Sequence, residues 1–139
     1  MQIRYLAGIS FRPDLHLFVW QPRGILDESH VEQIIAALEI TEDEADHPFD
    51  RYSDLSKLDA VEVSLDYVMR VSLYRRALYL NRRPVKSAIH VVNRETAELA
   101  ITHARLTLES SLQVRVFSHK GAAARWLRVS DADLDVDRS

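Results

Sequence analysis

The sequence predicts a single α/β domain with a mixed, mostly parallel five-stranded sheet and four helices, in the order β-β-α-β-α-β-α-β-α. Two β-rich runs separated by a turn open the chain. After them, short apolar runs alternate with stretches of helical periodicity. This alternation implies right-handed crossovers and parallel strands. The chain has 139 residues, the length of one domain.

The opening runs, residues 3–11 and 15–21, predict a β-hairpin. Pro13 and Asp14 lie between them, and both residue types favour turns. The second run is almost continuously apolar, which is typical of a strand buried on both faces. We therefore expect the first strand to be the one antiparallel strand, at an edge of the sheet.

Each predicted helix begins after a side chain that can accept a hydrogen bond from its first turn. Asp27, Ser64, Asn93 and Ser118 fill these N-cap positions. The first helix carries an apolar stripe at helical spacing. We expect it to end near Ile40, because acidic residues follow and negative charge is unfavourable at a helix C-terminus.

The apolar residues of the later helices are expected to be covered by the rest of the fold. In the second helix one face carries Tyr67, Val71, Tyr74 and Leu78, and the apolar surface continues over Leu65, Met69, Leu73 and Leu80. In the third helix, Ile101 and Leu108 are expected to point inward with the alanines. The remaining strands are predicted over residues 49–55, 86–92 and 112–117.

The domain is predicted to span residues 1–129, followed by an acidic tail over residues 130–139. Aspartates alternate in this tail with small or apolar residues. Because terminal segments with few large apolar groups order poorly, the tail is expected to be flexible.

The composition excludes several functions. The chain has no cysteine, which excludes disulfides, thiolate nucleophiles and cysteine-ligated metals. Its three glycines are far apart, so no Gly-rich phosphate loop exists. A net charge of -3 gives no basis for nucleic-acid binding. With no long apolar run and no export signal, a cytoplasmic protein is expected.

The histidines do not form a catalytic or metal-binding motif, and no cofactor is predicted. None has an i, i+4 partner on one helix. His90 is interpreted as a buried, hydrogen-bonded residue and His119 as an exposed one. A triad of Ser56, His119 and Asp54 lacks the sharp turn that would expose a nucleophilic serine. We therefore expect that the protein is not an enzyme.

Four stretches resemble the SpoIIAA-like branch of the STAS superfamily (sulfate transporter and anti-sigma-factor antagonist domains). They are residues 22–24, 54–56, 85–89 and 116–127. The resemblance implies the fold described above and a non-catalytic regulatory or protein-interaction module, with a protein partner that is not identified.

The phosphorylation loop of anti-sigma-factor antagonists is altered in this chain. In that family a phosphorylatable Ser or Thr follows an Asp at the start of the helix after strand three. Here Ala60 follows Asp59, and no glycine comes after it. Ser56 and Ser64 are the nearest hydroxyls and are the candidate phosphorylation sites, although the first interpretation of Ser64 is an N-cap. The resemblance therefore does not carry the phosphorylation switch to this chain.

The alternative function is binding of a small apolar or anionic ligand, either at the carboxyl-terminal rim of the strands or beside the second helix. SpoIIAA-like proteins resemble lipid-carrying Sec14-like domains in architecture. At the rim, Asp54, Ser56 and Asn93 are candidate ligand residues, and Ser64 lies at the next helix start. These are also ordinary turn and cap residues.

A basic stretch beside the second helix is the other candidate contact surface. Residues 68–86 contain six bases and no acid. Neighbouring acids can pair with such charges, or the charges can meet an anionic partner. A homodimer, through an edge strand or a helix face, is also consistent with the sequence. The predicted basic patch consists of Arg70, Arg75, Arg76, Arg82 and Arg83.

Overall fold

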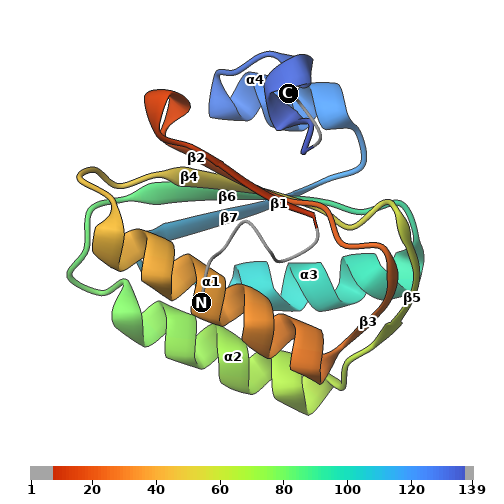
Figure 1. Ribbon diagram of the computed structural model, residues 1–139. Coiled ribbons are helices and arrows are strands. Elements are labelled where there is room, and N and C mark those ends of the chain that lie inside the picture. Colours follow the sequence, from red (N-terminus) through yellow and green to blue (C-terminus); the bar gives the residue numbers. More distant parts are fainter. Residues whose placement is uncertain (1–7, 137–139) are drawn as a thin grey trace.

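The computed structural model describes residues 8–136, which form a sheet with helices on both faces (Figure 1). Helices α1, α2 and α3 cover one face, and α4 covers the other. No described helix is both long and apolar enough to cross a membrane. The elements are β1 (Ile9–Arg12), η2 (Pro13–Leu15), β2 (Leu17–Trp20), β3 (Gly24–Asp27), α1 (Glu28–Glu44), β4 (Asp50–Asp54), β5 (Leu58–Glu62), α2 (Leu65–Leu78), β6 (Val85–His90), α3 (Arg94–Leu106), β7 (Leu112–Phe117), α4 (Lys120–Leu127) and η3 (Asp131–Leu134).

The main sheet has the predicted class and topology. Its strand order is β1-β2-β4-β6-β7. β1 pairs antiparallel with β2, and all the other pairs are parallel. One row of paired residues crosses the sheet through Phe18, Arg51, Ser87 and Val114. This row places an arginine in the middle of the sheet, between apolar and small neighbours.

A second, two-stranded sheet was not predicted. β3 pairs in parallel with β5, and a register shift lies between Gly24 and Ile25. Gly24 has a φ of 77°, a left-handed conformation that glycine adopts without steric cost. The sequence signal for β3 and β5 as strands is weak because both are short and because Asp59, Ala60 and Glu62 of β5 are exposed. The pair lies beside the end of the main sheet (Figure 1).

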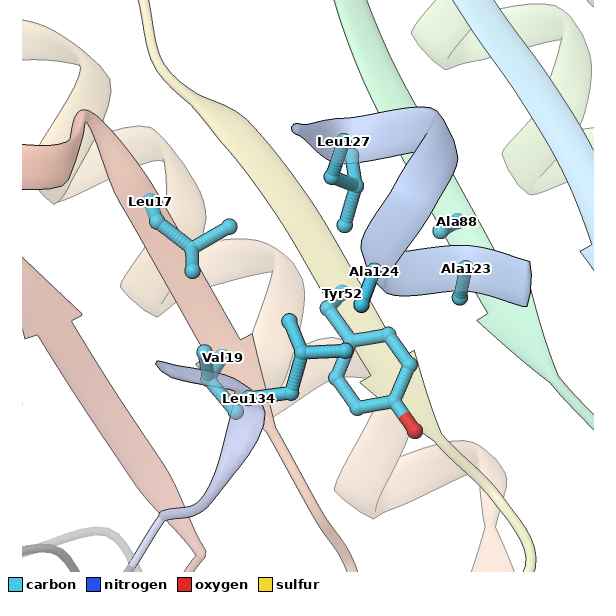
Figure 2. Close-up of a cluster of buried hydrophobic side chains, with 8 residues drawn as sticks. All are labelled: Leu17, Val19, Tyr52, Ala88, Ala123, Ala124, Leu127 and Leu134. Atoms are coloured by element: carbon cyan, nitrogen blue, oxygen red, sulfur yellow. The ribbon is translucent and has the colours of Figure 1, made fainter. Parts of the chain in front are cut away.

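The face under α4 has a compact apolar core (Figure 2). Successive side chains of a strand point to opposite faces, so Leu17 and Val19 lie on this side of β2. Ala123 and Ala124 let α4 approach the sheet closely, and Tyr52 lies under it. The cluster consists of Leu17, Val19, Tyr52, Ala88, Ala123, Ala124, Leu127 and Leu134.

The described part of residues 130–139 is not a tail separate from the domain but forms η3 and packs on the core. Ser130 caps η3 and completes a capping box with Asp133. Leu134 is 1% exposed and belongs to the core under α4. Arg12 also donates hydrogen bonds to the carbonyls of Asp133 and Asp135. Residues 137–139 lie outside the described part of the chain.

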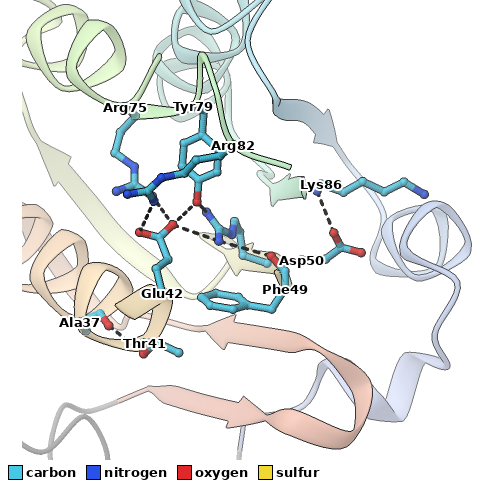
Figure 3. Close-up of polar contacts among 10 residues, drawn as sticks. Ala37, Thr41, Glu42, Phe49, Asp50, Arg75, Tyr79, Arg82 and Lys86 are labelled. Carbon is cyan, nitrogen blue, oxygen red and sulfur yellow. Dashed lines mark hydrogen bonds and ion pairs between the residues drawn. The ribbon is translucent and has the colours of Figure 1, made fainter. Parts of the chain in front are cut away.

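Two helix ends differ from the prediction. Helix α1 starts after its Asp27 cap as expected but continues to Glu44 instead of ending near Ile40. Thr41 is buried, and its hydroxyl donates to the carbonyl of Ala37 at 2.8 Å (Figure 3). Helix α4 has His119 rather than Ser118 at its N-cap position, without a side-chain cap.

The expected covering of α2 and α3 is also wrong. Leu65, Met69, Leu73 and Leu80 are all exposed, as are Ile101 and Leu108 on or just after α3. Helices α2 and α3 pack side by side and leave these side chains on their outer face. The caps were predicted correctly: Ser64 and Asn93 accept hydrogen bonds from the first turns of α2 and α3.

Candidate functional site

A cavity of about 190 Å³ lies between the main sheet and helices α1, α2 and α3. A benzene molecule fits in an apolar protein cavity of about 150 Å³. The lining is mainly apolar and comes from all three helices, both sheets and Leu55 after β4. It includes Trp20, Ile35, Leu38, Val61, Val71 and Leu99.

The cavity exists because the core on this face is divided. The buried apolar residues on the α4 side form one cluster, whereas those on the other side form three separate clusters. Small side chains occupy the middle of this face, where Ser53, Ser87 and Ala100 line the cavity. Protein interiors are usually close-packed, so an unfilled apolar space of this size is a candidate ligand site.

Two buried arginines line the same cavity. Arg51 extends from β4 and Arg75 from α2, and each residue is 4% exposed. Both reach the carboxylate of Glu42 on α1, whose Oε2 lies 3.2 Å from Nη2 of Arg51 and 3.0 Å from Nη2 of Arg75. The three elements around the cavity are therefore joined by one charged cluster (Figure 3).

Tyr79 supports the arginine cluster. Its hydroxyl accepts a hydrogen bond from Nη1 of Arg51 at 2.9 Å and donates one to Glu42. The guanidinium groups of Arg51, Arg75 and Arg82 lie 5.2 to 5.6 Å from the centre of its ring, within the range of a cation–π contact. Arg82 is partly exposed and lies 3.5 Å from Oε1 of Glu42.

The buried charges of this cluster do not balance. Arg51 and Arg75 are both buried. Among the described residues, Glu42 is the one acid that forms an ion pair with them. Nε of Arg51, Nη1 of Arg75 and Oε1 of Glu42 are buried and have no hydrogen-bond partner within residues 8–136. Buried charges and donors are normally paired. An anion in the cavity would supply the missing negative charge and acceptors for the two arginine N–H groups.

The charge state of Glu42 follows from its neighbours. Burial alone would raise the pKa of its carboxyl group, but the charges of Arg75 and Arg51 outweigh this and lower it. Glu42 is therefore ionised at neutral pH. It neutralises one of the two buried arginines and leaves one positive charge in excess.

His103 adds a neutral polar group to the cavity wall. Ser72 donates its only hydroxyl proton to the carbonyl of Val68, so Nδ1 of His103 donates to the Ser72 oxygen, 2.8 Å away. Burial and the charge of Arg75 lower the pKa of His103 to about 4. The histidine is therefore uncharged at neutral pH, and Arg51 and Arg75 carry the positive charge of the cavity wall.

The cavity has a charged end and an apolar end. Arg51 lies near the start of β4, whereas Leu55 follows the end of this strand. A strand rises about 3.3 Å per residue, so these residues are about 13 Å apart. Along α2, Tyr67 and Arg75 are separated by about 12 Å at 1.5 Å per residue. The arrangement suits an elongated molecule with one anionic end.

The predicted rim site forms a separate polar cluster. Asp54 accepts hydrogen bonds from the amide and hydroxyl of Ser56 and from Nε2 of Gln21. Burial would raise the pKa of Asp54, but these hydrogen bonds outweigh it and lower the pKa. Nδ1 of His90 lies 2.9 Å from the Tyr52 hydroxyl and 3.4 Å from Asp54. These side chains satisfy one another, as the interpretation of His90 expects.

The other predicted residues lie elsewhere. Arg23 joins Asp54 and Ser56 in lining a hollow at the rim, but Asn93 does not line it and accepts a hydrogen bond from Thr96 instead. Ser64 caps α2. The predicted basic patch is divided, because Arg75 points inside while other members lie at the surface. Arg70, Arg82 and Arg83 are exposed and Arg76 is half-buried.

Sequence reasoning missed Arg51 and His103, which line the cavity, and Glu42, which pairs with the buried arginines. Glu42 was interpreted as part of the acidic exit from the first helix. One signal could have identified Arg51: it lies in a short strand between Phe49 and Tyr52. A charged residue in a strand of a sheet covered on both faces needs a buried partner.

The comparisons with known proteins support the fold. No protein-family model matches the chain, and no curated protein matches it. Among solved structures, the chain is similar to an uncharacterised protein of the DUF3478 family from Shewanella loihica PV-4. The TM-score is 0.55 at 18% identity, over 86% of this chain and 90% of that one. That crystal structure is described as having a SpoIIAA-like fold, so the resemblance seen in the sequence is confirmed: this chain has a SpoIIAA-like fold.

Proposed function

We propose that this SpoIIAA-like domain is a binding module for a small amphipathic carboxylate, held in the cavity between the main sheet and helices α1 to α3. The observation that carries the proposal is the pair of buried arginines, Arg51 and Arg75, which line the apolar cavity and each have one buried N–H group without a partner among the described residues. The ligand carboxylate would lie between them, and its apolar chain would extend toward Leu55.

The size of the ligand follows from the cavity. An extended chain advances about 1.2 Å per bond, so a length of about 12 Å accepts up to about ten carbon atoms. The volume of about 190 Å³ favours the lower part of this range. A carboxylate accepts two parallel N–H···O bonds from a guanidinium, which makes arginine suited to such a head group.

The proposal keeps the regulatory role implied by the resemblance, with ligand occupancy as the signal. It does not require a catalytic step. A protein partner that responds to occupancy remains a prediction.

The test is a calorimetric titration of the full chain with octanoate, octanol and octylamine in turn. These compounds share a chain and differ only in the head group. We expect octanoate to bind, octanol to bind more weakly and octylamine not to bind. Arg75→Met should weaken octanoate about tenfold or more, because charged hydrogen bonds contribute about 1.5 to 3 kcal/mol each.

The matched control is Arg70→Met, which removes an exposed arginine from the same helix. It should bind octanoate as the unaltered chain does. The proposal is wrong if octanoate binds no better than octanol, or if Arg75→Met and Arg70→Met behave alike.

A further inference from the structure

Helices α1 and α2 lie side by side across the cavity, but they share no apolar core (Figure 1). Ile34 and Ala37 of α1 pack against apolar residues of β1 and β2. Leu78 of α2 packs instead in the cluster at the start of β6 and β7. None of the four apolar clusters within residues 8–136 contains side chains of both helices. Other contacts must therefore hold the seam between α1 and α2 closed.

Two hydrogen bonds from tyrosine to glutamate cross this seam. The Tyr67 hydroxyl donates to Oε2 of Glu32 at 2.7 Å. The Tyr74 hydroxyl donates to Oε2 of Glu39, also at 2.7 Å. In each helix the two partners are seven residues apart, so the pairs lie about 10 Å apart along the seam. Both tyrosines stay protonated at neutral pH, because burial at Tyr67 and the hydrogen bond to Glu39 at Tyr74 raise their pKa values. We call these two pairs the tyrosine latches.

The cavity lies behind the latches. Ile35 of α1 and Val71 of α2 fall midway between the two pairs in the sequence, and both line the cavity. Each of these two residues is half-buried. Tyr67 lines the cavity as well, although its hydroxyl reaches across the seam to α1. The latches therefore bound a stretch of the seam whose inner side is the apolar wall of the cavity.

The other walls of the cavity are joined more firmly. Backbone pairing joins β4 to β6 and β3 to β5, and α2 packs closely on α3. At the charged end, Glu42 holds Arg51 and Arg75 in buried ion pairs. By contrast, Tyr74 is 47% exposed, so water can replace its bond to Glu39. Segments with few buried apolar contacts open at the lowest free energy, which favours the seam as the place that opens.

We propose that the seam between α1 and α2 is the entrance of the cavity and that the tyrosine latches control it. Opening breaks the hydrogen bonds from Tyr67 and Tyr74 and separates the helices, while the buried ion pairs of Glu42 keep them joined at the charged end. The inference rests on the proposed function for the identity of the ligand that enters. The entrance itself is a property of the cavity and can be tested without a ligand.

The test is the rate at which a thiol on the cavity wall reacts with a small reagent. The chain has no cysteine, so Ala100→Cys introduces a single thiol there. Methyl methanethiosulfonate modifies the thiol, and mass spectrometry follows the reaction. When the seam opens and closes faster than the thiol reacts, the rate follows the population of the open form. We expect a much slower reaction than for Leu108→Cys, whose side chain is 65% exposed.

Removing both latches should speed the reaction of the cavity thiol. Tyr67→Phe and Tyr74→Phe, added to Ala100→Cys, should raise the rate about tenfold or more, because two hydrogen bonds that oppose opening are lost. Glu32→Gln with Glu39→Gln keeps an acceptor oxygen for each hydroxyl, so this pair of changes should raise the rate less.

The matched control is Tyr52→Phe in the same Ala100→Cys chain. It also removes a hydroxyl that is hydrogen-bonded, in this case to His90, but on the side of the sheet under α4. This control should leave the rate unchanged. The inference is overturned if the double tyrosine variant reacts no faster than the control, or if Ala100→Cys alone reacts as fast as Leu108→Cys.

Octanoate plays no part in this experiment, so its outcome is separate from that of the proposed function. Latch variants that react faster in a chain that binds no octanoate would support the entrance and contradict the proposed ligand. A chain that binds octanoate but whose latch variants react no faster would support the proposed function and place the entrance elsewhere.

Discussion

Glu42 on α1 and Arg75 on α2 meet in the interior, with 3.0 Å between Oε2 and Nη2, and each side chain is less than a tenth exposed. Arg51 reaches the same oxygen from the sheet. One carboxylate therefore holds two buried guanidinium groups, and no second acid forms an ion pair with them within the described residues. Because one acid serves two buried bases, removing Glu42 and removing one of the arginines should change the free energy of unfolding by different amounts.

Replacing Glu42 should destabilise the protein strongly. Glu42→Gln leaves Arg51 and Arg75 buried without a counterion, and breaking a buried pair in this way costs about 3 to 5 kcal/mol. Urea unfolding followed by circular dichroism measures the change. Arg75→Met is the matched variant, because Glu42 then keeps Arg51 and the buried charges balance. It should change the free energy of unfolding by less than about 1 kcal/mol or raise it. Equal losses in the two variants would contradict the excess of positive charge.

Acid should weaken the fold in two stages. The pKa of His103 is about 4 in the folded protein, below its ordinary 6.5, so the unfolded chain takes up this proton first as the pH falls. The stabilising effect of the neutral His103 is complete above pH 6.5 and is lost toward pH 4, by at most about 3 kcal/mol. Glu42, whose pKa is lowered from 4.5, loses its contribution at still lower pH.

His103→Leu should remove only the first stage. Urea unfolding at a series of pH values between 7 and 4 measures it as a smaller slope of stability against pH. Ser72 keeps its hydrogen bond to the carbonyl of Val68 in this variant, so little else changes. An unchanged slope would show that His103 is not the group that titrates.

A variant of Ser64 tests whether this residue is only a helix cap. Ser64 is the capping serine near the position of the family's phosphorylation loop. Its side chain accepts from the amide of Tyr67 at 3.1 Å. Ser64→Ala should lower the free energy of unfolding by about 1 kcal/mol, and Asn93→Ala, at the corresponding cap of α3, should do the same. Octanoate binding should be unaffected in both. A loss of binding in Ser64→Ala alone would assign Ser64 a functional role.

The fold could be predicted because its signals are local. Each signal depends on a few neighbouring residues. These signals are the alternation of strand and helix patterns, the Pro13–Asp14 turn, and the helix caps Asp27, Ser64 and Asn93. The two-stranded sheet β3–β5 could not be predicted, because its strands are short and partly exposed, and it depends on a pairing between distant segments. Leu134 was assigned to a tail for a similar reason: one apolar residue among aspartates gives no sign of the pocket it fills.

The candidate site was only partly predictable. A position beside the second helix and an anionic ligand were among the alternatives, and Arg75 was named. The cavity itself forms because small side chains, such as Ser87 and Ala100, line a space that larger ones would fill. The spacing of residues along the sequence does not show which side chains will face the same space. Glu42 was expected to be exposed to solvent because acidic residues surround it in the sequence. It is buried in the structure because Arg51 from β4 and Arg75 from α2 pair with it.

Two alanines on opposite faces of the sheet provide the most direct test of the cavity. Ala100 on α3 lines it, whereas Ala124 on α4 lies in the compact core under that helix. Ala124→Leu adds three carbons to a filled space and should cost about 1 to 3 kcal/mol. Ala100→Leu adds them to an empty one and should leave the free energy of unfolding unchanged or raise it by up to about 2 kcal/mol, since each of the three buried carbons contributes at most about 0.8 kcal/mol. It should also abolish octanoate binding while Arg51 and Arg75 remain in place. If Ala100→Leu destabilises as much as Ala124→Leu, the space is not available to a ligand.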